Sequence, residues 1–168
     1  YWGDMYTEVF EEISREFPDV ATHHELVDAA CMKFVSSPWA FDVVVASNLQ
    51  GDILTDLAAV ISGGMGVAPS CNLNPTDPDM PSMFEPTHGS APDIAGQGIA
   101  NPYSMIGSFA MMLEYSFGMH EEAKNIWDAM QGVFADGFST ADLSKSGADV
   151  TMLKTHEFGD KVAEKLLA

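Results

Sequence analysis

Two aspartates, Asp52 and Asp56, lie four residues apart within the stretch from Asn48 to Leu57. In a helix this spacing places both carboxylates on one face, where like charges repel by about 0.2–0.5 kcal/mol unless a cation neutralises them. The stretch is otherwise strongly apolar, and no Lys or Arg lies within a turn of either aspartate. Hard cations prefer oxygen ligands, so the pair indicates a site for Mg²⁺ or Mn²⁺.

A simpler interpretation of the same aspartates remains open. Asp52 would then cap its helix and favour the helix dipole, while Asp56 would be a solvated surface charge. Asp28 also stands at the start of a predicted helix, where a carboxylate is common. It becomes a third metal ligand only if the fold, or a second subunit, brings it to Asp52 and Asp56.

A second stretch with chemical potential runs from Glu85 to Asn101 and is rich in glycine and other small residues. Such residues expose backbone N–H groups and allow close approach by a phosphate or a ribose. His88 and Ser90 add side-chain donors. Asp93 offers a carboxylate to a ribose diol; it would repel a 2′-phosphate, which favours NAD over NADP. No G-x-G-x-x-G motif follows a strand, so this is not a Rossmann site, and a rigid surface loop is the alternative.

Alternating helices and strands are predicted to position these residues, which gives an α/β fold class. Helices are expected over 1–17, 28–37, 51–62, 102–117 and 121–135, and strands over 42–47, 66–69 and 82–85. Residues 20–27 are expected to be a strand or an extended connection, and 86–101 and 139–150 to be loops. Thr155 is predicted to cap a last helix whose inward-facing residues are Phe158, Val162, Leu166 and Leu167.

The composition restricts the class of protein further. The net charge is −18, from 25 acidic against 7 basic residues, which argues against nucleic acid or an anionic membrane as a partner. Cys31 and Cys71 do not make a disulfide framework, and two reduced thiols in a cytoplasmic protein are expected. No apolar run reaches membrane length. The chain begins at Tyr1, inside a predicted helix, so we expect it to be part of a longer protein.

The two stretches together resemble the metal-dependent β-decarboxylating dehydrogenases, the family of isocitrate, 3-isopropylmalate, homoisocitrate and tartrate/D-malate dehydrogenases. The matching motifs are N-L-x-G-D-I-L-x-D-L over 48–57 and E-P-x-H-G-S-A-P-D-I-A-G-x-G-I-A-N-P over 85–102. The resemblance covers nearly the whole chain. Residues 72–75 and 84–88 are most similar to the tartrate/D-malate branch.

The resemblance implies an isopropylmalate-dehydrogenase-like fold, with a mixed sheet, flanking helices and the C-terminal half of a two-domain subunit. Residues 1–62 would belong to the dimerisation and metal-site domain, and 63–168 to the dinucleotide-binding domain. Asp52 and Asp56 match metal ligands, and Asp28 matches a third ligand that the partner subunit of a homodimer supplies. The residues that match NAD-binding positions are Glu85, His88, Gly89, Ser90, Ala91, Pro92, Asp93 and Asn101.

The implied activity is NAD-dependent oxidation of a malate- or tartrate-like 2-hydroxy acid, followed by metal-assisted loss of CO₂. The alternatives are 3-isopropylmalate or isocitrate oxidation, or a non-catalytic module that binds metal and nucleotide. The family's substrate arginines, catalytic tyrosine and catalytic lysine match no position of this chain, so no catalytic residue is assigned and the chain alone is expected to be inactive. Gln50 stands where many members carry an aromatic residue or Asn. Gln97 stands where many carry Lys, although a glutamine fits the tartrate/D-malate branch.

Overall fold

The computed structural model describes residues 2–74, 76–77, 79–143 and 149–168. These residues form an α/β structure, as predicted, and divide into two compact units, 1–57 and 58–168. The described helices are α1 (Trp2–Ser14), α2 (Val27–Ser36), α3 (Asn48–Ile61), α4 (Tyr103–Phe117), α5 (His120–Ala135) and α6 (Thr155–Leu166). The described strands are β1 (Pro69–Asn72), β2 (Met83–Pro86), β3 (Phe138–Ser139) and β4 (Thr151–Met152). Three single turns of 3-10 helix are η1 (Pro38–Ala40), η2 (Met65–Val67) and η3 (Pro92–Ile94).

The first unit contains α1, α2, η1 and most of α3. Phe34 of α2 is buried and packs edge-on against Phe41, with 4.7 Å between the ring centroids. Many other large apolar side chains of this unit are exposed; they include Val9, Ile13, Phe17, Leu26, Met32, Val35, Trp39 and Leu49. The unit therefore buries only part of the apolar surface that its sequence provides.

The strand predicted over 42–47 is wrong for this structure. The segment is extended without ladder pairing, and the side chains of Val43 and Val45 are 85% and 63% exposed. A strand needs a neighbour that accepts and donates its backbone hydrogen bonds. Among the described residues of the first unit no strand is present to do so. Residues 20–26 form a connection without ladder pairing, the second of the two options expected for 20–27, and Val27 already belongs to α2.

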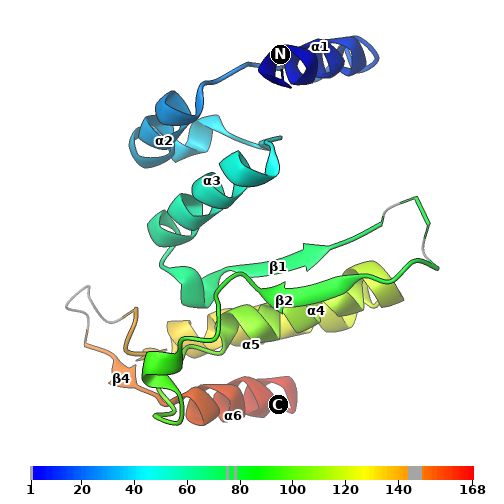
Figure 1. The fold of residues 1–168 in the computed structure, drawn as a ribbon. Coiled ribbons are helices and arrows are strands. Elements are labelled where there is room, and N and C mark those ends of the chain that lie inside the picture. The colour runs from blue at the N-terminus through cyan, green and yellow to red at the C-terminus, as the bar shows by residue number, and fades with distance from the viewer. Residues whose placement is uncertain (1, 75, 78, 144–148) are drawn as a thin grey trace. The chain divides into compact units, whose positions relative to one another are not determined.

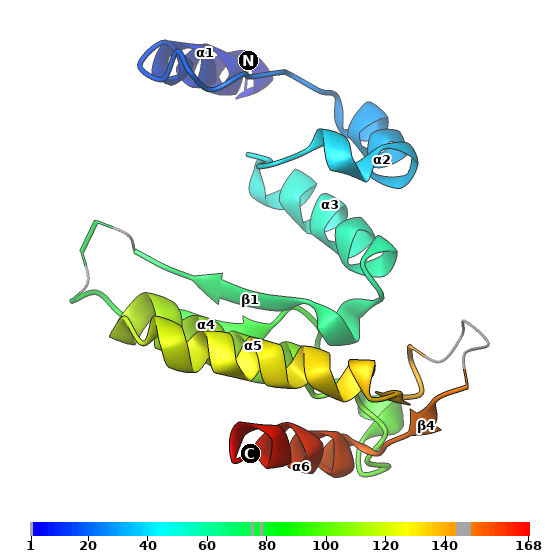
Figure 2. The ribbon, with the colours of Figure 1, turned by 180° about the vertical axis from the view of Figure 1, so that it is seen from behind.

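The second unit is built in layers on α4 and α5. β1 and β2 form an antiparallel hairpin with Pro69 opposite Pro86, and both strands contact α4. On its other side α4 packs against α5, and α5 packs against α6, so the order of layers is hairpin, α4, α5, α6 (Figures 1 and 2). β3 and β4 form a separate, parallel two-stranded sheet in which Phe138 pairs with Thr151.

The core of the second unit lies between the three helices. On α5 the buried residues recur at helical spacing, with Ala123, Ile126, Met130 and Val133 on one face. The remaining members of the core are Tyr103 and Ala110 of α4, Ala129 of α5, and Phe158 and Val162 of α6. Burying one such large side chain contributes about 1.5–3 kcal/mol, so this cluster fixes the positions of the three helices.

Small residues let the hairpin approach α4 closely. Gly107 lies where a Cβ atom would be 2.7 Å from Cη2 of Trp127 and 3.2 Å from Cβ of Pro69. At the next position, the hydroxyl of Ser108 donates to the carbonyl of Ser104 at 2.8 Å and accepts the N–H of Ser70 at 3.4 Å. α4 is therefore in direct contact with both α5 and β1 at the same level.

Several predicted element ends need correction. The strand expected over 66–69 begins only at Pro69, because residues 65–67 form the 3-10 turn η2. Leu166 and Leu167 do not face inward; Leu167 is 89% exposed, since α6 ends at Leu166. Thr155 is the first residue of α6 and not its cap, a position that Lys154 takes. Part of the loop expected over 139–150, namely 144–148, lies outside the described residues.

No helix in the described part of the chain is long and apolar enough to cross a membrane. The assignment of 1–62 and 63–168 to the two domains of the family stays a prediction.

We predict that Gly107→Ala destabilises the protein by about 1–3 kcal/mol, because the added methyl group overpacks the contact with Trp127 and Pro69. Gly159→Ala is the matched control: it is also a glycine in a helix, but an added Cβ would meet no atom within 4 Å. This control should stabilise the protein by about 0.5–1 kcal/mol. Urea unfolding measures both, and equal effects of the two substitutions would contradict the packing argument.

We also predict that added salt stabilises the fold. A net charge of −18 makes the compact state repel itself, and ions screen this repulsion beyond about 3 Å at 1 M ionic strength against about 10 Å at 0.1 M. The thermal unfolding midpoint should therefore rise between about 0.05 and 1 M NaCl. A midpoint that stays constant or falls over this range would show that self-repulsion is not a significant term.

Candidate functional site

The two candidate metal ligands on α3 are both exposed and share a helix face. Because α3 begins at Asn48, Asp52 lies more than a turn inside the helix, which is too far in for it to be the capping residue. The capping interpretation of Asp52 is therefore wrong. Its Oδ2 accepts a long hydrogen bond, 3.4 Å, from the side-chain amide of Asn48.

No Lys, Arg or His among the described residues forms an ion pair with Asp52 or Asp56. Two exposed carboxylates one turn apart, without a compensating cation among the described side chains, form a donor set that suits a hard divalent ion with water as its remaining ligands. The chemistry of the pair is thus compatible with Mg²⁺ or Mn²⁺.

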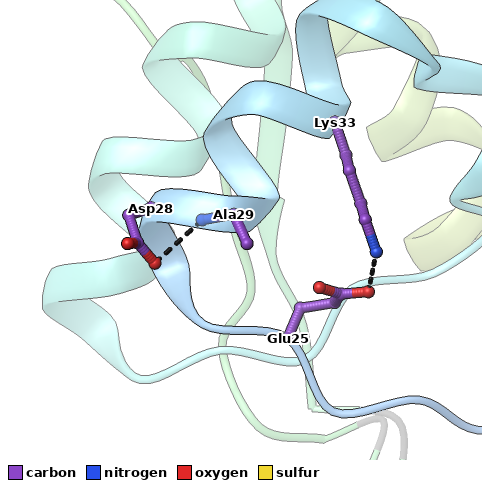
Figure 3. A network of polar contacts seen from close by, with 4 residues as sticks. All are labelled: Glu25, Asp28, Ala29 and Lys33. Atoms are coloured by element: carbon purple, nitrogen blue, oxygen red, sulfur yellow. Dashed lines mark hydrogen bonds and ion pairs between the residues drawn. The ribbon is translucent and has the colours of Figure 1, made fainter.

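Asp28 stands in the first turn of α2, where its Oδ1 accepts the N–H of Ala29 at 2.9 Å (Figure 3). Nearby, Lys33 forms an ion pair with Glu25 that joins α2 to the segment before it (Figure 3). Within the described residues no three His, Cys, Asp or Glu side chains lie close enough to hold a metal ion together. The structure therefore does not bring Asp28 to Asp52 and Asp56 within one chain.

The candidate nucleotide loop leaves β2 and enters α4. Its start is fixed by the hairpin: Glu85 is opposite Ser70 in the ladder, and the N–H of Thr87 donates to the carbonyl of Ala68 at 3.0 Å. The side chain of Glu85 is exposed. The long loop predicted over 86–101 is confirmed, with the single turn η3 inside it.

The residues after His88 form an exposed rim of mostly small side chains. His88 Nδ1 lies 2.8 Å from the carbonyl of Gly89, so this nitrogen carries the proton. Ala91 has a φ of 41°, a left-handed conformation that is uncommon outside glycine and clusters at functional loops. The rim comprises Gly89, Ser90, Ala91, Pro92 and Asp93, all exposed.

Asp93 and Gln97 show how the middle of the loop is held. The side-chain amide of Gln97 donates to the backbone carbonyl of Asp93 at 2.9 Å, and the N–H of Gln97 donates to the carbonyl of Ile94 at 3.1 Å. The carboxylate of Asp93 stays exposed, where it can accept hydrogen bonds from a ligand. Gln97 thus closes one turn of the loop with hydrogen bonds from both its side chain and its backbone.

Asn101 closes the loop and is only 6% exposed. Its Oδ1 accepts the N–H of Tyr103, one of the helix-start N–H groups that lack a partner within α4, at 3.0 Å. Its Nδ2 donates to Oδ2 of Asp142 at 3.2 Å. Asp142 was missed by sequence reasoning, because nothing in its own neighbourhood connects it with a residue 41 positions away. Contact of Asn101 with adenine stays a prediction.

Two groups near this region have a shifted pKa. Burial raises the pKa of the Tyr103 hydroxyl, and the donated hydrogen bond from Gln131 partly offsets that effect. Burial also raises the pKa of the Cys71 thiol on β1, so less of it is thiolate at neutral pH. Cys31 and Cys71 are both free and half-buried, in accord with the expected reduced thiols.

Comparisons with known proteins cover both the aspartate pair on α3 and the candidate nucleotide loop. The sequence profile of the isocitrate/isopropylmalate dehydrogenase family matches residues 1–162. The 3-isopropylmalate dehydrogenase of Halalkalibacterium halodurans is 48% identical over 164 residues, which are 98% of this chain and 44% of that protein. The enzyme of the same name from Streptomyces coelicolor is 46% identical over 164 residues, again 98% of this chain and 44% of that protein.

Solved structures agree in fold. The isocitrate dehydrogenase of Methylococcus capsulatus superposes with a TM-score of 0.89 at 40% identity, covering 98% of this chain and 46% of that one. A β-decarboxylating dehydrogenase of Thermococcus kodakarensis, in its apo form, gives a TM-score of 0.78 at 34% identity, with coverages of 99% and 46%. The chain thus spans less than half the length of these relatives. Over nearly all of its own length, it belongs to the isocitrate/isopropylmalate dehydrogenase family.

Proposed function

We propose that the whole protein is an NAD-dependent, Mg²⁺- or Mn²⁺-dependent dehydrogenase that oxidises and decarboxylates a small 2-hydroxy acid. The observation that carries the proposal is the match of residues 1–162 to this family, in a chain that keeps an uncompensated carboxylate pair on α3 and an exposed glycine-rich loop after β2. Each stretch supplies one requirement of the reaction. The carboxylates would hold the metal, and the loop would hold the coenzyme.

Asp52 and Asp56 would hold the cation from α3, and Asp28 would complete the site from the partner subunit of a homodimer. The dimer is supported by the large apolar side chains that the first unit leaves exposed. A second observation also supports it: within the described part of one chain, Asp28 does not lie close enough to Asp52 and Asp56 to share a metal ion with them. When bound, the cation supplies Lewis-acid polarisation of the substrate's oxygen atoms.

The loop would bind the adenosine half of NAD. Backbone N–H groups of the rim and the hydroxyl of Ser90 would donate to the phosphates, as would His88 once its ring N–H turns away from the carbonyl of Gly89. The carboxylate of Asp93 would accept hydrogen bonds from the ribose hydroxyls. Glu85 stands at the entrance to this rim, and Asn101 would shape its far end. When bound, NAD supplies the hydride acceptor.

The substrate is a dicarboxylate with a hydroxyl group next to one carboxylate. The relatives of highest similarity reported above are named 3-isopropylmalate dehydrogenase, and this favours 3-isopropylmalate. The malate- or tartrate-like acid expected from residues 72–75 and 84–88 gains no support from those names. We therefore propose 3-isopropylmalate as the first substrate to test, with D-malate and tartrate beside it.

We predict that the full-length protein forms NADH, followed by its absorbance, when it is given its 2-hydroxy acid and Mn²⁺. Asp52→Asn and Asp56→Asn should each lower kcat/KM by at least about 100-fold, because each removes a charged oxygen ligand. Asp19→Asn, an exposed aspartate between α1 and α2, is the matched control and should leave the rate within about twofold of wild type.

The same assay identifies the substrate, since the three acids are compared at equal metal concentration. An Asp52→Asn protein with the full metal-dependent rate would exclude the α3 metal site. If none of the three acids supports NADH formation, the proposed activity is wrong.

We predict further that Asp93 sets the coenzyme preference. Asp93→Ser removes the carboxylate that would repel a 2′-phosphate, so the ratio of kcat/KM for NAD to that for NADP should fall by about 10-fold or more. Asp79→Ser, a substitution of an exposed aspartate in the β1–β2 loop, controls for the change in net charge. If both variants shift the ratio equally, the preference depends on overall charge and not on Asp93.

A further inference from the structure

The nucleotide loop is fixed at its start and its finish, but its last turn has little support from within. Thr87 is held by the hairpin, and Asn101 is held by Tyr103 and Asp142. Between them, Gly96 and Gly98 have φ values of 77° and 64°, and residues 95–100 are exposed. Backbone with glycines in this conformation loses much entropy when it is ordered, so contacts from outside the loop decide its geometry.

Thr155 supplies such contacts from a distant part of the chain. Its backbone N–H donates to the carbonyl of Gly98 at 2.9 Å, and its Oγ1 donates to the carbonyl of Ala100 at 2.5 Å. One residue thus holds two carbonyls that lie two positions apart in the loop.

The hydroxyl of Thr155 is not engaged in starting its own helix. That role falls to Glu157, whose carboxylate accepts the N–H of Lys154 at 2.7 Å. A hydroxyl at a helix start commonly serves as a cap, and here it points instead to the loop. The direction of this bond suggests that the hydroxyl serves the loop more than the helix.

The helix that carries Thr155 is a firm support. One turn beyond it, Phe158 is fully buried and its ring lies 5.3 Å from that of Phe134 on α5; Val162 is buried a further turn along. The start of α6 therefore keeps its place relative to α5, and the two hydrogen bonds transmit that placement to residues 98–100.

We propose that Thr155 is a positioning residue for the coenzyme, whose hydroxyl holds the last turn of the nucleotide loop in its binding geometry. The inference rests on the proposed function, since it takes the loop as the NAD-binding element. Thr155 would not touch NAD. It would act through the backbone of Gly98 and Ala100, as supporting residues act on ligands they do not contact.

The test uses the full-length protein with two substitutions at one position. Thr155→Val keeps the β-branched shape and the N–H but removes the hydroxyl, whereas Thr155→Ser keeps the hydroxyl. The dissociation constant of NADH, from its fluorescence enhancement on binding, should rise about 3- to 10-fold for the valine variant, the effect of one lost hydrogen bond. It should return to within about twofold of wild type for the serine variant, which restores that bond.

The steady-state constants give an independent readout. For Thr155→Val, KM for NAD should rise by the same factor, while kcat at saturating NAD and the activation constant for Mn²⁺ stay within about twofold, since only ground-state binding is weakened. Thr151→Val, the same change at an exposed threonine of β4, should alter none of these quantities. If valine lowers the thermal unfolding midpoint enough to unfold the protein, Thr155→Ala removes the hydroxyl with a smaller side chain and replaces it in the comparison.

Two outcomes would overturn the inference. One is a hydroxyl-free variant that binds NADH with the wild-type dissociation constant. The other is a serine variant as weak as the valine variant, which would make side-chain shape the cause. In either case the wild-type protein still reduces NAD, so the failure is distinct from failure of the proposed function, in which wild type neither binds NADH nor forms it.

Discussion

The contact of α4 with the β1–β2 hairpin and with Trp127 of α5 is the constraint on which the second unit depends. The candidate nucleotide loop leaves β2 and enters α4, so its shape follows from how these two elements are aligned. Gly107 permits this alignment because even one methyl group would meet Trp127 and Pro69. Ser108 adds a polar link to β1 at the same level. A long loop with three glycines is restrained here because both of its ends are attached to packed elements.

The first unit presents the opposite situation. Its helices form where the sequence predicts them, yet Val43, Val45 and Trp39 remain exposed. Helices satisfy their own backbone hydrogen bonds, whereas a strand requires a neighbour. The segment over 42–47 has the composition of a buried strand but no pairing partner among the described residues, so it stays extended. The exposed apolar surface and the separated position of Asp28 both support assembly with further protein surface, which the proposed dimer would provide.

Local signals in the sequence were sufficient for most helices and for the loop. The apolar periodicity predicted α4 and α5 to within about one residue, and the prolines and glycines of 86–101 predicted the long loop. Contacts between distant residues were not predictable in this way. The pairing of Asn101 with Asp142 and the bonds from Thr155 to Gly98 and Ala100 depend on how the fold brings distant segments together. The prediction that Thr155 is a cap is wrong for the same reason. A cap hydroxyl accepts a helix N–H, whereas in the fold this hydroxyl donates to the carbonyl of Ala100.

The distribution of charge adds a last physical condition on the site. No Lys or Arg occurs between Lys33 and Lys124, a span that includes both candidate metal ligands of α3 and the whole nucleotide loop. In the proposed coenzyme site the loop would therefore contribute no Lys or Arg side chain to a pyrophosphate. Its donors would be backbone N–H groups, the hydroxyl of Ser90 and a ring N–H of His88 released from Gly89. Neutral donors of this kind work only when they are held in the correct geometry, because they lack the long-range attraction of a charge. If the loop binds NAD as proposed, its anchoring by Thr87, Asn101 and Thr155 takes the part that basic side chains play in many phosphate sites. The aspartate pair on α3 follows the same logic with the opposite sign. Asp52 and Asp56 form no ion pair with a described Lys, Arg or His, so both carboxylates remain available to a cation from solution.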